Sequence, residues 1–173
     1  MPLLNISDLD AIVFDFDGVL TDDHVYLDQD GREMVRCTRT DGIAFDILRT
    51  TALKLFIVTT EENSVVTHRA AKLKVPVLHG VRNKLEALTR LADEEGFTLA
   101  RTLYVGNDVN DFFAMTACGF SACPSDAHAE IQKVARFTLE KAGGQGVARE
   151  IAEKLLGLDG VKQWHKGCEP KGK

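Results

Sequence analysis

The sequence predicts an α/β fold, a doubly wound parallel sheet of Rossmann-like architecture with a projecting β-hairpin. The order of segments along the chain supports this prediction. Short apolar segments with the composition of buried strands alternate with amphipathic segments of helical periodicity along most of the 173 residues. Such alternation is typical of parallel sheets in which the crossover helices cover both faces. A chain of this length with 45% apolar residues can bury one core, so we expect one domain over residues 1–157 and a C-terminal tail over 158–173.

The strands are expected where short apolar runs occur. Residues 11–14 form the first run and precede the sequence DFDGVLTD. The further runs, in chain order, are 53–58, 76–78, 102–105, 120–122 and, as a possible sixth strand, 137–139.

Polar residues that favour helix N-termini precede the helical segments. The expected caps are Asp41 for a helix to about Thr51, Asn63 for a helix through Leu73, Asn83 for a helix through Glu95, and Asn110 and Asp126 for two shorter helices.

Residues 24–38, HVYLDQDGREMVRCT, interrupt this alternation. Two extended runs flank a polar turn, which predicts a β-hairpin that projects from the sheet. Its edges could pair with another chain, or the hairpin could be a flap of a monomer.

Composition excludes several classes of function. The formal net charge of −5 disfavours nucleic-acid binding, and no apolar run approaches the ~20 residues needed to cross a membrane. The four cysteines form neither a CxxC pair nor a disulfide framework, and the first residues contain no apolar signal segment. We therefore expect a cytoplasmic protein that binds neither nucleic acid nor membranes.

Asp15 and Asp17 follow the first strand and are one residue apart. Because side chains alternate along an extended chain, both carboxylates are expected to point the same way. Two close carboxylates repel unless a cation lies between them, and Mg²⁺ is the usual oxygen-bound ion. The simpler alternative is a strand that ends in a solvated acidic turn.

Other strand ends supply complementary groups. Thr59 follows the second strand, Lys84 begins a later helix, and residues 106–111, GNDVND, follow the fourth strand. In a doubly wound sheet these ends meet at one edge. An anionic nucleophile with hydroxyl, ammonium and acidic groups suits phosphoryl transfer, in which positive charge must neutralise the phosphate oxygens.

Together these motifs, DxDGxLTD, a hydroxyl, a lysine and a GxD cluster, resemble those of the haloacid dehalogenase (HAD) superfamily of phosphatases over about residues 11–156. The resemblance implies a HAD-like fold. Asp15 would form an aspartyl-phosphate, Asp17 would act as acid and base, and Thr59 and Lys84 would hold phosphoryl oxygens. It also implies Mg²⁺ as cofactor, and the implied ligands are Asp15, Asp17, Asn107 and Asp108, with Asp111 behind them or on a metal-bound water.

The absence of a cap domain and the ending GGQGVAREIAEKLL from Gly143 resemble the cap-less phosphatases of keto-sugar acid biosynthesis. In octulosonate enzymes a Thr-Gly-Arg sequence typically follows the second strand, whereas Thr60 and Glu61 follow Thr59 here. Glu61, Arg69 and Lys72 instead match the nonulosonate enzymes. The residues expected to bind substrate are therefore Thr60, Glu61, Arg69 and Lys72. A solvated helix face is the alternative for the two cations.

The resemblance thus implies a phosphatase for a nonulosonate 9-phosphate, either 2-keto-3-deoxynonulosonate (KDN) 9-phosphate or N-acetylneuraminate 9-phosphate. A 3-deoxy-octulosonate 8-phosphate phosphatase is the first alternative. The second is a weakly active or inactive tetramerisation domain associated with an acylneuraminate cytidylyltransferase, because Asn107 stands where active relatives usually have a metal-binding aspartate. An asparagine can offer its carbonyl oxygen to Mg²⁺, but it brings one negative charge fewer than an aspartate. The resemblance further implies a homotetramer in which a neighbouring chain's hairpin and residues 143–146 help to complete each site.

Overall fold

The structure, a computed structural model, describes residues 3–168, and within them a six-stranded parallel sheet has the order β5-β4-β1-β6-β7-β8. The doubly wound fold is therefore confirmed, and every expected strand is present to within a residue or two. The strands are β1 (Ala11–Phe14), β4 (Lys54–Val58), β5 (Val77–Leu78), β6 (Thr102–Val105), β7 (Phe120–Cys123) and β8 (Phe137–Thr138).

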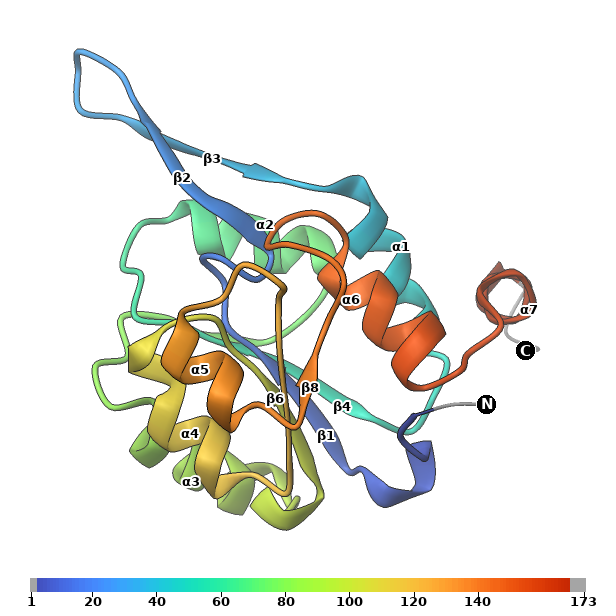
Figure 1. Ribbon diagram of the computed structural model, residues 1–173. Helices are drawn as coiled ribbons and strands as arrows, with labels where there is room; N and C mark the ends of the chain where they lie inside the picture. Colours follow the sequence, from blue (N-terminus) through green and yellow to red (C-terminus); the bar gives the residue numbers. More distant parts are fainter. Residues whose placement is uncertain (1–2, 169–173) are drawn as a thin grey trace.

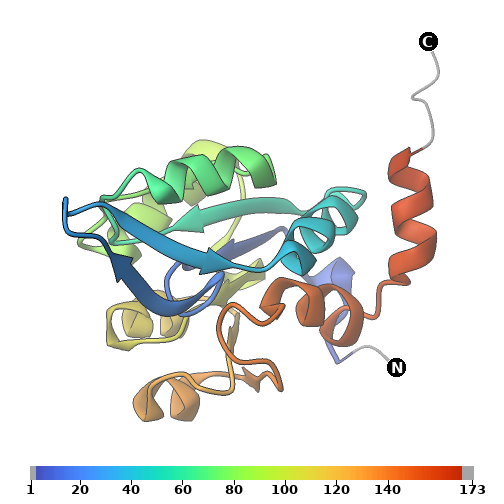
Figure 2. The ribbon, with the colours of Figure 1, turned by 90° about the horizontal axis from the view of Figure 1, so that it is seen from above.

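Helices cover both faces of this sheet (Figures 1 and 2). One core contains Ile12 and Phe14 from β1 and apolar residues of α1, α2 and α6, while the other contains Ala11 and Val13 and residues of α3, α4 and α5. Successive side chains of β1 thus point into the two cores in turn. The helices are α1 (Arg39–Leu48), α2 (Val65–Leu73), α3 (Lys84–Glu95), α4 (Phe112–Ala117), α5 (Ala129–Val134), α6 (Val147–Glu150), continued by the π-helical segment η4 (Ile151–Leu155), and α7 (Gly160–Cys168). Short 3₁₀ turns are η1 (Ile6–Asp8), η2 (Leu99–Arg101) and η3 (Val109–Asp111).

The helix caps follow the sequence prediction only in part. Asn83 accepts the N–H of Glu86 and caps α3 as predicted, and Asn63 accepts the N–H of Val65 at the start of α2. The predicted helix start at Asn110 lies instead in η3, which leads into α4.

Two predicted caps are wrong because their carboxylates bind distant segments. The side chain of Thr38 caps α1, while Asp41 is buried and accepts the N–H of Ala148 in α6. His128 caps α5, while Asp126 accepts the N–H of Gly143. A carboxylate satisfies whichever unpaired donor the tertiary fold brings near it, and local sequence does not contain that information.

The predicted hairpin forms a separate two-stranded antiparallel sheet, β2 (Thr21–Leu27) and β3 (Glu33–Cys37), that extends away from the body (Figure 1). It begins earlier than predicted, because Thr21 pairs with Cys37. Its exposed apolar side chains are Val25, Tyr26, Leu27 and Met34. Among the described helices, none is both long and apolar enough to span a bilayer.

The expected C-terminal tail is helical in its described part. Helix α7 lies beside α1, and Thr50 donates a hydrogen bond of 2.9 Å to Gln163. Residues 169–173 of the expected tail lie outside the described residues.

Candidate active site

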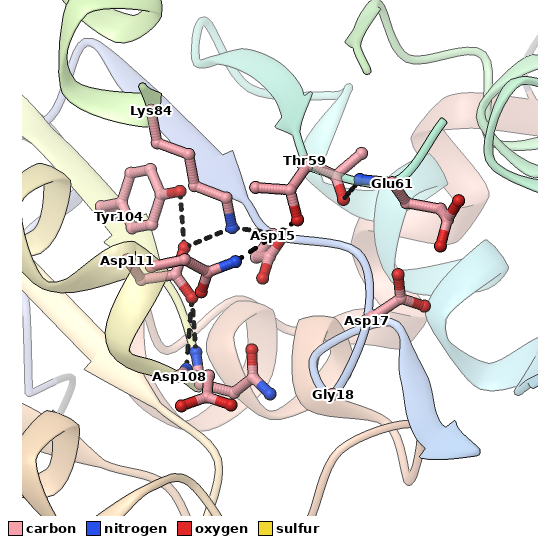
Figure 3. A network of polar contacts seen from close by, with 12 residues as sticks. Asp15, Asp17, Gly18, Thr59, Glu61, Lys84, Tyr104, Asp108 and Asp111 are labelled. Atoms are coloured by element: carbon pink, nitrogen blue, oxygen red, sulfur yellow. Dashed lines mark hydrogen bonds and ion pairs between the residues drawn. The ribbon is translucent and has the colours of Figure 1, made fainter. Parts of the chain in front are cut away.

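Polar side chains from three strand ends lie together at the carboxyl edge of the sheet (Figure 3). Asp15 follows β1, Thr59 follows β4, and residues 106–111 follow β6. These three strands are neighbours, with β1 between β4 and β6. Parallel pairing of these strands therefore brings together the three segments that the sequence predicts to meet.

Lys84 lies at the centre of a buried ionic cluster. Its Nζ atom is 2.9 Å from Oδ1 of Asp15 and 2.7 Å from Oδ1 of Asp111. Lys84 is only 2% exposed although it is the first residue of α3, so the whole side chain extends inward. The two carboxylates outweigh burial and raise the pKa of Lys84, although burial by itself acts to lower it. Lys84 is consequently a fixed ammonium group beside Asp15.

Asp111 accepts four hydrogen bonds and supports this cluster. Its Oδ1 accepts from Lys84 and, at 2.9 Å, from the hydroxyl of Tyr104. Its Oδ2 accepts the backbone N–H groups of Asn107 at 2.9 Å and Asp108 at 3.3 Å. With no exposed surface and four donors around it, Asp111 holds Lys84 and the loop after β6 in place.

Tyr104 is the member of this cluster that sequence reasoning missed. It lies in the buried strand β6, where the sequence TLYV indicates only a core strand. The available signal was its hydroxyl, since a buried tyrosine usually needs a hydrogen-bond partner.

Asp15 and Asp17 are both held in environments that disfavour a negative charge. Burial, followed by repulsion from Asp111, raises the pKa of Asp15 to about 8 against the opposing effect of Lys84. Burial, followed by the charge of Glu61, raises the pKa of Asp17 to about 6, although Thr21 donates a hydrogen bond of 3.3 Å to its Oδ1. Two such carboxylates need added positive charge to ionise together, and Asp17 can exchange a proton near neutral pH.

Asn107 lies against the turn that carries Asp17. Gly18 has φ +68°, and a Cβ atom there would be 1.9 Å from Nδ2 of Asn107. Within residues 3–168, no three or more His, Cys, Asp or Glu side chains converge as a metal site. The remaining donors are the carboxylates of Asp15 and Asp17 and the amide oxygen of Asn107. Hard oxygen donors of this kind fit Mg²⁺, with one negative charge fewer than three carboxylates.

Asp108 lies outside the buried cluster. It is exposed, and its Oδ1 accepts the N–H of Val109 at 2.7 Å as the cap of η3. The structure therefore assigns the two acidic residues of this loop different environments, with Asp111 buried and Asp108 at the surface.

The residues after β4 form one wall of the site. Thr59 is 1% exposed, and its Oγ1 accepts the N–H of Glu61 at 3.1 Å. Thr60 accepts a weak hydrogen bond of 3.4 Å from Asn110, which connects the loops after β4 and β6. Glu61 is close enough to Asp17 to raise its pKa.

Arg69 and Lys72 do not join this cluster within the chain. Both line a groove of about 530 Å³ between α2 and β3. Arg69 donates a hydrogen bond of 2.7 Å to the backbone oxygen of Thr38 at the base of the hairpin. The helical spacing correctly predicts a shared face, but that face lies beside the hairpin.

The sequence matches known proteins over most of its length. Residues 59–151 match the family model of haloacid dehalogenase-like hydrolases. A 3-deoxy-D-manno-octulosonate 8-phosphate phosphatase of Escherichia coli K12 is 31% identical over 157 residues, which are 90% of this chain and 84% of that protein.

Solved structures show the same fold. A HAD family hydrolase from Streptomyces avermitilis has 45% identity and a TM-score of 0.87, covering 90% of this chain and 89% of its own. The 3-deoxy-D-manno-octulosonate 8-phosphate phosphatase of Moraxella catarrhalis, in complex with magnesium ion, phosphate ion and 3-deoxy-octulosonate (KDO), has 25% identity and a TM-score of 0.86, covering 95% of both chains.

Proposed function

Since this chain belongs to the haloacid dehalogenase-like hydrolases, we propose that it is a Mg²⁺-dependent phosphatase that acts through an aspartyl-phosphate on Asp15. The observation that carries the proposal is the buried cluster in which Lys84 Nζ lies 2.9 Å from Asp15. Its relatives include phosphatases of sugar acids, one of them with magnesium and phosphate bound. A phosphate monoester of a keto-sugar acid is the proposed class of substrate.

The chain's own residues would divide the reaction into two steps. A carboxylate oxygen of Asp15 attacks phosphorus, the bond from phosphorus to the sugar oxygen breaks, and Asp17 gives that oxygen a proton. Asp17 then takes a proton from water, which attacks phosphorus and breaks its bond to Asp15, releasing inorganic phosphate. Lys84 and the hydroxyl of Thr59 hold the phosphoryl oxygens throughout.

Of the four Mg²⁺ ligands that the resemblance implies, we propose Asp15, Asp17 and Asn107. The fourth, Asp108, is exposed and caps η3, so we propose that it acts only through a metal-bound water. When bound, the ion supplies positive charge that offsets repulsion between the carboxylate of Asp15 and the phosphate oxygens. That charge also favours the ionised form of Asp15, whose pKa burial and Asp111 raise to about 8.

For the substrate itself, the relatives favour 3-deoxy-octulosonate 8-phosphate over the nonulosonate 9-phosphates that the sequence motifs favour. We therefore propose octulosonate 8-phosphate as the first candidate. The nonulosonate 9-phosphates form the second, because Glu61, one of the residues that match the nonulosonate enzymes, faces Asp17 (Figure 3) and raises its pKa. Arg69 and Lys72 line the groove between α2 and β3. They would therefore bind a sugar carboxylate in that groove and not beside Asp15 and Lys84.

The homotetramer and the association with an acylneuraminate cytidylyltransferase also stay proposals. The exposed apolar side chains of the hairpin, such as Leu27 and Met34, support an interface there. Within the Gly-rich residues 143–146, Gly143 and Gly144 contact this chain's own turn 18–22, and a neighbouring chain's copy of the segment remains part of the proposed tetramer.

Phosphate release with Mg²⁺ tests the proposal. The substrates are 3-deoxy-octulosonate 8-phosphate, KDN 9-phosphate and N-acetylneuraminate 9-phosphate, with 4-nitrophenyl phosphate as a general ester. Asp15→Asn should lose at least about 10³-fold in kcat, while Asp93→Asn, an exposed carboxylate on α3, should not change. Equal rates for Asp15→Asn and wild type would contradict the nucleophile assignment. Release from none of the four esters would favour the inactive assembly domain.

A further inference from the structure

The Gly-rich segment between β8 and α6 is pressed against the turn that carries Asp17. Figure 1 shows this segment reaching the start of β2. Gly144 donates its N–H to the backbone oxygen of Val19 at 3.0 Å. A Cβ atom on Gly143 would lie 2.3 Å from the backbone oxygen of Gly18, and one on Gly144 would lie 2.6 Å from the nitrogen of Asp22. The two glycines are therefore required by close backbone contact with the turn.

Three carboxylates, one each from α1, from the loop before α5 and from α6, fix this segment over residues 140–148. Glu150 accepts the N–H groups of Glu140 at 3.0 Å and Lys141 at 2.8 Å. Asp126 accepts that of Gly143 at 2.9 Å. Asp41 accepts that of Ala148 at 3.0 Å, where α6 begins. The segment is thus held at its start, its middle and its end.

Asp41 is the unusual member of this set. It is 1% exposed, and among the described residues its Oδ2 has no hydrogen-bond partner. Burying a carboxylate with one unsatisfied oxygen is costly, and the N–H group of Ala148 at the start of α6 offsets part of that cost. Because Asp41 belongs to α1, which follows the hairpin, it connects that helix to the start of α6, where the Gly-rich segment ends.

We propose that Asp41 is a positioning residue for Asp17, acting through the segment 143–148 and its contacts with the turn 18–22. The inference rests on the function proposed above, in which Asp17 protonates the leaving oxygen. Loss of the bond to Ala148 frees the end of the segment, loosens the contacts of Gly143 and Gly144, and lets Asp17 move from its position. Misplacement of an acid by about 1 Å can cost up to ~10²-fold in rate.

Leaving-group dependence separates positioning from a general loss of folded protein. A sugar alkoxide needs the proton from Asp17, whereas 4-nitrophenolate leaves without one. We expect Asp41→Ala to lower kcat/KM, which reports formation of the aspartyl-phosphate and not its later hydrolysis, about tenfold for whichever sugar-acid phosphate the wild type hydrolyses fastest. For 4-nitrophenyl phosphate the same ratio should fall less than about threefold. Asp41→Asn keeps an acceptor oxygen and should restore most of the rate. Asp46→Ala, a half-buried carboxylate on the same helix that pairs with Arg49 and makes no hydrogen bond or ion pair with the segment, should leave both rates unchanged. Equal losses on both esters in Asp41→Ala would overturn the proposal.

Amide hydrogen exchange tests the same inference without activity. In Asp41→Ala, residues 140–148 and residues 16–22 should both exchange faster than in wild type and in Asp46→Ala. If only residues 140–148 change, the segment does not hold the turn and the proposal is wrong. If the wild type hydrolyses no ester, the proposed function fails, and the exchange data still decide whether Asp41 fixes the turn.

Discussion

Asp111→Asn tests whether one buried carboxylate organises the site. The substitution keeps the shape of the side chain and replaces one acceptor oxygen by an NH₂ group that faces two donors. Lys84 keeps Asp15 as a partner 2.9 Å away, so no buried charge is left unpaired. Two donors without an acceptor cost about 1–3 kcal/mol each, and relief of the repulsion between Asp111 and Asp15 reduces the sum to about 2–4 kcal/mol.

Urea unfolding followed by circular dichroism measures this loss. The matched control is Asp108→Asn on the same loop, where Asn caps a helix as well as Asp and the expected change is below about 0.5 kcal/mol. The two variants should therefore differ by at least about 1.5 kcal/mol with an unchanged denaturant slope. Equal free energies of unfolding would refute the assignment of Asp111 as the support of Lys84 and the loop after β6.

Three further predictions concern stability and metal use. The pKa of Asp41 is about 6 in the folded protein, raised by burial from 3.8. Since the folded state holds its proton more tightly, stability rises as pH falls, and wild type should gain about 1.4 kcal/mol over Asp41→Asn between about pH 7.5 and about pH 5 in urea titrations. No such gain would mean that Asp41 is not desolvated. Asn107→Asp should lower the Mg²⁺ concentration for half-maximal phosphate release, because it restores one negative charge, and an increase would argue against Asn107 as a ligand. Gly144→Ala should lower the melting temperature much more than Gly96→Ala. Both positions have φ near +66°, but a Cβ atom meets backbone only at the first. Equal shifts would show that backbone strain alone matters.

Local pattern was sufficient to predict the sheet and the position of the site. Apolar runs of strand length identify β1, β4 and β6, and the parallel topology then places their carboxyl ends side by side. Asp15, Thr59 and the loop after β6 meet for that reason. Asn83 predicts the start of α3, which sets Lys84 at the edge of the site. These features depend on neighbours within a few residues or on general rules of topology.

Tertiary structure alone decided the partners of the buried polar groups. Asp41 and Asp126 occupy sequence positions typical of helix N-caps. Their side chains instead accept hydrogen bonds from Ala148 and Gly143, which lie far along the chain. The acidic pair Asp108 and Asp111 looks equivalent in sequence, and only packing buries Asp111 against Lys84. A hydrogen bond forms with whichever donor the fold brings within about 3 Å, and periodicity does not encode that meeting. The sequence by itself thus determined which strand ends carry the chemistry, and long-range packing determined how each carboxylate is held.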